Sequence, residues 1–199
     1  MKHSFSYIIL VFLCNLLLIV ESSCQSNSQK RDSIQKGTRV FDKKPKFDTL
    51  LNEFAKPIGY VNDYGGLYTS DQVYEMDSII YDFETKTSLQ IVIVTFDSVM
   101  VNSSQVDEVT IAIGNGWKVG GVSSKGIVVG ISKPFKKIRI QNGKYVHRIL
   151  SDSKTKELID SVFIPEFKND RYFEGTLSGL NALKKALQHS LAEKTKVQF

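Results

Sequence analysis

Two runs of β-branched and aliphatic residues dominate the hydrophobic pattern of the chain. Residues 89–95 and 126–131 each have the length of a strand, and neither alternates as a strand does when one of its faces meets water. A helical pattern separates them, and the second run follows about thirty residues after the first, which is the spacing of a β-α-β unit. We therefore expect two parallel, buried strands at the centre of an α/β domain, with any functional site beyond their carboxyl ends.

Apolar positions spaced three and four apart predict the helices around these strands. The first has its N-cap at Thr69, a capping box with Gln72, and a buried stripe that continues to about Lys86. The other predicted helices begin at Ser103 or Ser104, run from Ser151 or Asp152 to Pro165, and span about 170–188.

The segments between these helices carry turn and strand signals. Residues 61–67 have the composition of a turn into the first helix, and residues 145–150 that of a short extended or irregular piece. In residues 137–141, Ile138 and Ile140 alternate with polar neighbours. This alternation predicts an edge strand, antiparallel to residues 126–131 and half open to water.

The first 23 residues have the features of a signal peptide. A short basic start precedes about fourteen apolar residues, fewer than the roughly twenty that a membrane-spanning helix needs. Ser22 and Ser23 then precede Cys24, as in bacterial lipoproteins whose cysteine is lipidated, although Glu21 stands where such sites carry an aliphatic residue. We expect an extracytoplasmic lipoprotein that is anchored to the membrane of the bacterial envelope through Cys24. Plain secretion of a soluble periplasmic protein is the alternative.

The 199 residues have the composition of one globular domain, with 42% hydrophobic and 24% charged residues. Residues 24–56 are polar and predict a tether with a short helix near its end. Residues 57–190 make up the predicted folded domain, and 191–199 a frayed tail. The net charge of +5 suits an anionic partner, and we expect that partner to be no nucleic acid.

Three carboxylates, Asp63, Asp97 and Asp152, follow the expected ends of strands or loops. If they converge, their oxygens could hold a hard cation such as calcium. The alternative interpretation is structural, with Asp63 and Asp97 in turns and Asp152 at a helix cap. The sequence contains no zinc motif, EF-hand loop or G-x-S-x-G nucleophile motif.

A basic segment follows the second buried strand and spans sixteen residues without an acidic one. Its cations are Lys133, Lys136, Lys137, Arg139, Lys144 and Arg148. An anionic headgroup, a phosphate or an acidic protein would suit this segment. The alternative is a solvated edge strand whose lysines prevent pairing with another chain.

Five stretches, together with single positions between the last two, resemble the TPM domain family in their order and spacing. The stretches are residues 61–67, 90–95, 117–120, 126–131 and 164–175, and the single positions are Arg139-Ile140, Gly143, Leu150 and Asp152. That family includes extracytoplasmic bacterial proteins and a thylakoid-lumen protein linked to photosystem II repair. The resemblance implies a three-layer α/β/α sandwich around a short mixed sheet. It also implies, for some members, a calcium or similar divalent site and an acid phosphatase activity.

The chain departs from the family pattern at three places, of which up to three carry an acidic residue in the family. Ser124-Lys125-Gly126 stands where the family has Asp-Asn-Gly or Asn-Asn-Gly, and Gln141 replaces a glutamate. Residues 143–147 lose a glycine and a carboxylate and end at His147. The pattern indicates a loss of negative charge at the positions where the resemblance implies a metal site.

Asp63 and Asp152 remain from the family pattern. We hypothesise a degenerate metal site at a mouth shared by Asp63 and the turn at 124–126, in which Lys125 occupies part of the space of the cation. We therefore expect no cofactor, or at most weakly bound calcium.

The function expected from these observations is that of a membrane-tethered, non-catalytic binding or accessory module in the cell envelope. Its partner would be an unknown envelope protein or an anionic membrane surface. The alternative is a divalent-metal-dependent acid phosphatase that uses Asp63, Asp97 and Asp152.

Overall fold

Four strands form one mixed sheet in the structure, a computed structural model that describes Phe54 and residues 56–197. The strands are β1 (Val61–Asp63), β2 (Gln90–Thr95), β3 (Gly126–Ser132) and β4 (Lys137–Asn142). They lie in the sheet in chain order, with β1, β2 and β3 parallel and β4 antiparallel to β3. The predicted parallel pair, its β-α-β connection and the antiparallel edge strand are confirmed.

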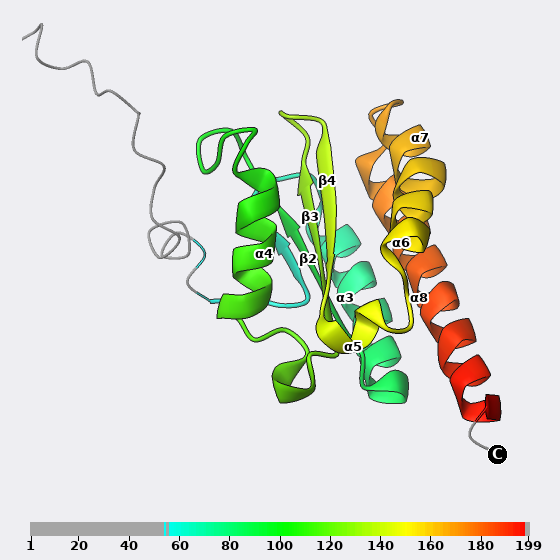
Figure 1. Cartoon of the computed structure of the whole chain (residues 1–199). Helices are drawn as coiled ribbons and strands as arrows, with labels where there is room; N and C mark the ends of the chain where they lie inside the picture. The colour runs from blue at the N-terminus through cyan, green and yellow to red at the C-terminus, as the bar shows by residue number, and fades with distance from the viewer. Residues whose placement is uncertain (1–53, 55, 198–199) are drawn as a thin grey trace, which may run out of the picture. The chain divides into compact units, whose positions relative to one another are not determined.

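Helices cover both faces of this sheet, as Figure 1 shows. The larger helices are α3 (Ser70–Thr87), α4 (Val106–Gly116), α6 (Asp152–Leu158) and α8 (Tyr172–Val197). The short helical turns are η2 (Gly121–Ser123), α5 (Lys144–His147), the π-helical turn η3 (Ile159–Phe163) and α7 (Ile164–Phe167). In Figure 1, α4 lies on one side of the sheet, and α3, α6 and α8 lie on the other. The expected three-layer α/β/α arrangement is confirmed.

The central strands are buried on both faces because their side chains pack into two separate hydrophobic cores. On the side of α3 and α8, Ile91 and Ile93 of β2 pack in a cluster with apolar residues of those helices. On the side of α4, Val92 and Val94 pack with Val109 and its neighbours. Alternate residues of one strand point to opposite faces. Both faces are covered here, and this explains why the run that is centred on β2 shows no polar alternation.

The connections β1-α3-β2 and β2-α4-β3 have opposite handedness. Both advance across the sheet in the same direction, since the strand order is β1-β2-β3. Their helices nevertheless pack in the clusters on opposite faces. One of the two crossovers is therefore left-handed, against a general preference for right-handed connections that comes from strand twist.

The predicted start of α3 is confirmed, whereas the predicted start of α4 is wrong. Thr69 caps α3, and Thr69 and Gln72 form the reciprocal capping box. Helix α4 begins at Val106, with Gln105 at its N-cap rather than a serine. The side chain of Asn102 accepts hydrogen bonds from the backbone N–H groups of Ser104 and Gln105. These bonds hold the residues before α4 in a turn, so the helix starts later than the serines suggested.

Two segments that were predicted to be irregular form regular elements. Residues 61–63 are strand β1 rather than part of a turn, because they pair with residues 93–95 of β2. Of residues 145–150, predicted as a short extended or irregular piece, 145–147 belong to the short helix α5 (Lys144–His147). Both elements lie at the border of the sheet, where pairing with β2 or packing of Val146 in the core overrides weak local preferences.

The chain continues in helical form past Pro165, so the predicted helix end there is wrong. The π-helical turn at 159–163 follows α6, and Pro165 lies in the first turn of α7. In that position the missing N–H of proline breaks no intrahelical bond.

Helix α8 runs to Val197, beyond the predicted end near residue 188 and through most of the predicted frayed tail. Leu191 packs against the core cluster on this side, and Ala192, Glu193 and Lys194 are strong helix formers.

The predicted signal peptide, Cys24 and nearly all of the predicted tether at 24–56 lie outside the described residues. Only Phe54 and Lys56 of the tether are described, and Phe54 is buried against the α4 side of the sheet. Among the helices of the described part of the chain, none is long and apolar enough to span a membrane.

Candidate functional site

The candidate carboxylates lie at two opposite ends of the sheet. Asp63 pairs in register with Thr95, the last residue of β2, so it marks the carboxyl end of the parallel strands. The opposite, amino end is where β2 and β3 begin, and there Gln90 pairs with Gly126. Five residue steps along β2 separate these levels, which is about 17 Å at the rise of a strand.

Asp63 uses both of its carboxylate oxygens to hold the turn between β1 and α3. Its Oδ1 accepts hydrogen bonds from the backbone N–H of Leu67 at 3.0 Å and from the hydroxyl of Thr95 at 2.5 Å. Its Oδ2 accepts a bond from the backbone N–H of Tyr68 at 2.9 Å. The Thr95 hydroxyl in turn accepts a bond from the backbone N–H of Gly65 at 2.7 Å. The carboxylate therefore ties the first two strands to the start of α3.

Asp97 follows β2 at the same end of the sheet, but its side-chain bonds stay within its own turn. Its Oδ1 accepts hydrogen bonds from the backbone N–H and the hydroxyl of Ser98. The backbone N–H groups of Met100 and Val101 donate to the carbonyl of Asp97. The structural interpretation of Asp97 as a turn residue fits these contacts.

A groove of about 580 Å³ opens beside Asp63 at the carboxyl end, between the 65–67 turn and the start of α8. Lys133 lies in its wall, forms an ion pair with Asp170 at 2.9 Å, and stands over the ring of Tyr172 at 5.2 Å. Glu174 adds a second carboxylate to the lining. Asp170 and Glu174 are not among the site residues predicted from the sequence, because they precede or open a helix rather than follow a strand.

Tyr68 lies behind the Asp63 turn and hydrogen-bonds the buried hydroxyl of Thr176 in α8 at 2.9 Å. Burial, assisted by the negative charge of Asp63, raises the pKa of the Tyr68 phenol well above its ordinary value. The phenol is therefore neutral at physiological pH and acts as a packed, hydrogen-bonded support of the turn.

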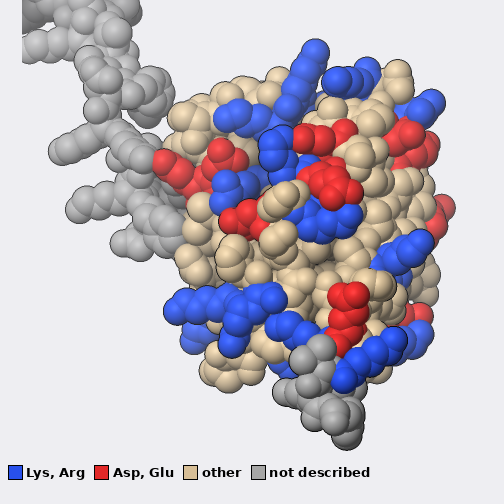
Figure 2. Space-filling model, turned by 45° about the vertical axis from the view of Figure 1, so that its right-hand side comes forward, with Lys and Arg blue, Asp and Glu red and all other residues tan. Residues whose placement is uncertain are grey.

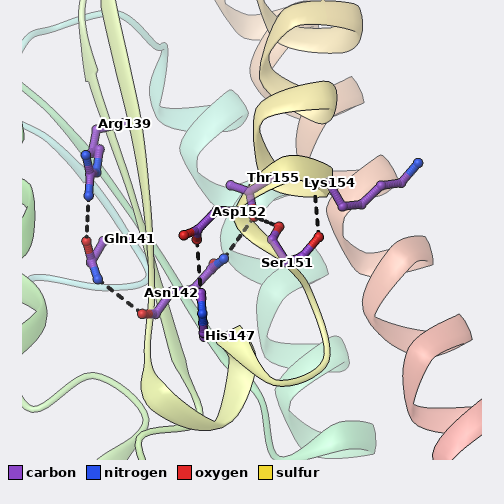
Figure 3. A network of polar contacts seen from close by, with 8 residues as sticks. All are labelled: Arg139, Gln141, Asn142, His147, Ser151, Asp152, Lys154 and Thr155. Carbon is purple, nitrogen blue, oxygen red and sulfur yellow. Dashed lines mark hydrogen bonds and ion pairs between the residues drawn. The ribbon is translucent and has the colours of Figure 1, made fainter.

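At the amino end, Asp152 and His147 belong to a chain of polar contacts that Figure 3 shows. The Nδ1 atom of His147 lies 3.3 Å from Oδ1 of Asp152, and both side chains are largely exposed. Ser151 caps α6 through a bond from the backbone N–H of Lys154. The side chain of Asn142, the last residue of β4, donates to the hydroxyl of Thr155 at 2.9 Å. These contacts fasten α6 to the end of β4.

The structure does not bring the predicted metal residues together. Asp63 and Asp97 lie at the carboxyl end, whereas Asp152, His147 and Lys125 lie at the amino end. The backbone of Lys125 pairs with Gln90 at the very start of β2. The expected mouth shared by Asp63 and the 124–126 turn is therefore wrong, because the length of the sheet separates them. Within the described residues, no three His, Cys, Asp or Glu side chains are grouped so that they could hold a metal ion.

The basic segment is spread along the outer edge of the sheet rather than gathered in one patch. Lys133 and Lys136 lie around the β3–β4 turn, and Lys137 and Arg139 are in the edge strand β4. Lys137 donates to the backbone carbonyl of Ser103, and Arg139 donates to Gln141.

Lys144 and Arg148 complete the segment at the amino end, in and after α5. Figure 2 shows a cluster of Lys and Arg side chains at the lower left of the described surface, and acidic side chains lie to the right of this cluster. Acidic and basic side chains are interspersed in the upper part of the same face.

The three departures from the family pattern lie together at the amino end. Ser124 and Gln141 line one groove there, together with Lys144. Lys125 stands over the ring of Tyr145, with its Nζ 5.2 Å from the ring centre. The turn at 124–126 was predicted to lie beside Asp63, but its structural neighbours are the end of β4 and α5.

The family model described as the TPM domain matches residues 61–186 of the chain. Among solved structures, the solution structure of the N-terminal domain of a protein from P. gingivalis superposes with a TM-score of 0.61. It has 21% sequence identity and covers 67% of this chain and 84% of that one. The N-terminal domain of a protein from Corynebacterium glutamicum matches with a TM-score of 0.49 and 15% identity, over 67% of this chain and 80% of that one. None of the curated proteins matches the chain.

Proposed function

Because this chain belongs to the TPM domain family, we propose that it is a non-catalytic binding or accessory module of the bacterial cell envelope. In this proposal the domain lies outside the cytoplasm and is tethered to a membrane through Cys24. It contacts an anionic partner through the cations of the basic segment.

The use of the Asp63 carboxylate is the observation that carries this proposal. Both of its oxygens accept hydrogen bonds from the turn that they organise. A cation bound there would have to compete with two backbone N–H donors and a hydroxyl. Asp152 lies at the other end of the sheet beside His147. These contacts support a structural role for the two carboxylates and favour binding over metal-assisted hydrolysis.

Unpaired cations along the edge strand support the choice of an anionic partner. Lys136, Lys137, Arg139, Lys144 and Arg148 form no ion pair with any residue that the structure describes. A partner that supplies carboxylates or phosphates would give these cations charge-assisted hydrogen bonds. The same cations also discourage pairing of β4 with another strand, so the edge is suited to side-chain contacts rather than to sheet extension.

Lipidation of Cys24 would place this edge close to a membrane. Twenty-nine residues lie between Cys24 and Phe54, the first residue that the structure describes. A chain of that length spans at most about 100 Å when fully extended, so lipidation of Cys24 would keep the domain within that distance of the bilayer.

Metal-dependent hydrolysis of phosphate esters is the alternative function, and the carboxyl-end groove is where it would occur. Its lining holds Asp170 and Glu174 beside Lys133, close to the Asp63 turn. An aryl phosphate assay with added calcium or magnesium separates the two functions. We expect no metal-dependent hydrolysis by the purified protein. A turnover that requires the metal and disappears in both Asp63→Asn and Asp170→Asn would instead identify a phosphatase.

A cross-linking experiment in cells tests the binding function. The full chain is compared with a variant in which Lys136, Lys137 and Arg139 are changed to glutamate. We expect the wild-type protein to cross-link to an envelope component and the charge-reversed variant to lose this product. Equal cross-linking by both proteins would contradict a role of the edge cations. Labelling with a fatty acid, in parallel with Cys24→Ser, reports the tether independently.

A further inference from the structure

A rigid loop at the amino end presents an apolar side chain to solvent. Residues 117–125 connect α4 to β3, and Val122 at the tip is fully exposed. Exposed single valines are common on protein surfaces. This one lies on a loop with unusual backbone geometry and is surrounded by cations, and these two features call for an explanation.

Two residues of the loop that have a Cβ atom adopt the unfavourable left-handed backbone conformation. Lys118 and Ser124 have φ angles of 53° and 51°, values that are unfavourable for residues with a Cβ atom. The backbone N–H of Gly120 donates to Oε1 of Gln90 at 2.7 Å. A Cβ atom on Gly120 would come within 2.0 Å of the backbone nitrogen of Gly126. The loop is thus seated tightly on the sheet, and its tip projects because the backbone is fixed.

Next to the tip lies a groove of about 580 Å³ with a cationic lining. It is bounded by α4, the loop and the end of β4, and its charged residues are Lys118 and Lys144. Ser124 and Gln141 add polar groups, and the lining contains no acidic residue. The carbonyls of Gly114 and Asn115 near the end of α4 already accept bonds from the loop backbone. The negative end of the helix dipole is therefore partly satisfied, and the lysines dominate the groove.

Two more cations lie beside this groove and are held by one aromatic ring. Lys125 and Arg148 both stand over the ring of Tyr145, at 5.2 and 5.7 Å from its centre. The backbone N–H of Tyr145 donates to the carbonyl of Ser124, which joins the ring to the loop. Asp152 also lies at this end of the sheet, with its Oδ1 3.3 Å from Nδ1 of His147. The amino end thus combines four cations with an apolar tip.

We infer that the amino end is a peripheral membrane-binding site for anionic glycerophospholipids. The groove between Lys118 and Lys144 takes the phosphate of a lipid headgroup, and Val122 enters the bilayer interface beside it. Lys125 and Arg148 contact neighbouring headgroups. A bilayer supplies both an apolar layer for the valine and a dense array of phosphates for the cations, which an acidic protein surface does not. This inference rests on the proposed function and deepens it by naming a partner for one end of the domain.

Vesicle co-sedimentation tests the inference. The expected mature chain, residues 24–199, carries Cys24→Ser so that no acyl chain contributes to binding. We expect it to bind vesicles that contain 30% phosphatidylglycerol (about one lipid in three) and not vesicles of phosphatidylcholine alone. Val122→Ser, which changes no charge, should weaken binding on the order of tenfold, as expected for withdrawing a valine from an apolar layer. The double variant Lys118→Gln, Lys144→Gln should weaken it at least as much.

The opposite end of the sheet provides matched controls. Val99, which is 88% exposed beyond β2, is changed to serine. Lys56, whose backbone carbonyl accepts a bond from Tyr64 just after β1, and Lys168 are both exposed and are changed together to glutamine. We expect both controls to bind vesicles as the wild-type protein does, and all variants to keep the wild-type circular dichroism spectrum and melting temperature.

Three results would overturn the inference. The first is no binding to anionic vesicles, and the second is equal weakening by the carboxyl-end controls. The third is binding of inorganic phosphate, seen as NMR shifts at Lys118 and Lys144, without any vesicle binding. Each of these leaves the proposed function standing if the edge-cation variant still loses its cross-linked partner. Metal-dependent hydrolysis of the aryl phosphate would refute the proposed function whether or not vesicles bind.

Discussion

Replacement of Asp63 by alanine tests whether this carboxylate stabilises the fold or serves a reaction. The change removes the acceptor of two backbone N–H groups and of the Thr95 hydroxyl. Thr95 is fully buried, so its hydroxyl would lose a partner that water cannot replace. The 65–68 turn would lose the group that joins it to both β1 and β2.

The structure gives a magnitude for this loss. A hydrogen bond to a charged acceptor contributes about 1.5–3 kcal/mol, and an unsatisfied buried hydroxyl costs about 1–3 kcal/mol. Asp63 is half-buried, so water recovers part of what its two backbone donors lose. We therefore expect Asp63→Ala to lower the free energy of unfolding by about 3 kcal/mol. Domains of this size have about 5–15 kcal/mol in total, so the effect is large.

Urea unfolding followed by circular dichroism measures the effect, with Asp97→Ala as the control. Asp97 makes its side-chain bonds only to Ser98, and its loss should cost less than about 1 kcal/mol. Functional carboxylates are commonly held at some cost to stability, and their removal is often neutral or stabilising. If the free energy of unfolding of Asp63→Ala lies within about 0.5 kcal/mol of the wild-type value, which is about a twofold change in the folding equilibrium, the structural role is refuted. Such a result would point to a role in a reaction or in ligand binding.

Three further predictions concern stability. Thr69→Ala removes the capping box of α3 and should cost about 1 kcal/mol in urea unfolding. Gly179→Ala places a Cβ atom 2.1 Å from the ring of Phe163, and we expect a loss of about 2 kcal/mol or more. Stability should also fall above pH 10, because burial raises the pKa of Tyr68 in the folded state, so the unfolded chain loses the phenol proton first. Tyr68→Phe should flatten that decline and, by unpairing Thr176, cost about 1 kcal/mol at pH 7.

Each of these predictions has a control at an exposed position. Thr85→Ala within α3 and Ser178→Ala beside Gly179 should change stability by less than about 0.5 kcal/mol. Tyr74→Phe, at a side chain that is 75% exposed, should leave the alkaline decline as it is. A Tyr68→Phe profile that declines as steeply as the wild type would contradict the assignment of the titration. A cap or glycine variant that matches its control would contradict the corresponding contact.

The sequence was sufficient to predict the strands that are buried on both faces. The runs at 89–95 and 126–131 are covered on both faces, so their composition alone marks them as central strands. Thr69 and Gln72 act locally, and their pattern located the start of α3. β1 was missed because its three residues are fixed by pairing with β2, which no local pattern reveals. The opposite hands of the two crossovers also depend on which face each helix covers.

The candidate site was harder to predict because spacing along the chain says little about the two ends of a sheet. Asp63 follows a strand, whereas Lys125 precedes one, and in parallel strands these positions lie apart. The family resemblance made them appear to belong to one site. The groove at the amino end could not be foreseen, since it joins α4, a loop and β4, which only the register of β3 and β4 brings together.

The position of α8 determines the order in which the parts of this domain can fold. Leu180, Leu183 and Leu187 of that helix cover the same sheet face as α3, which comes from the start of the domain. A chain that emerges from a ribosome or a translocation channel with its N-terminus first can pair β1 to β4 early. Helix α3 covers only part of this isoleucine-rich face, and the rest stays exposed until α8 packs on it. The core on this side is therefore completed only by the last helix of the domain.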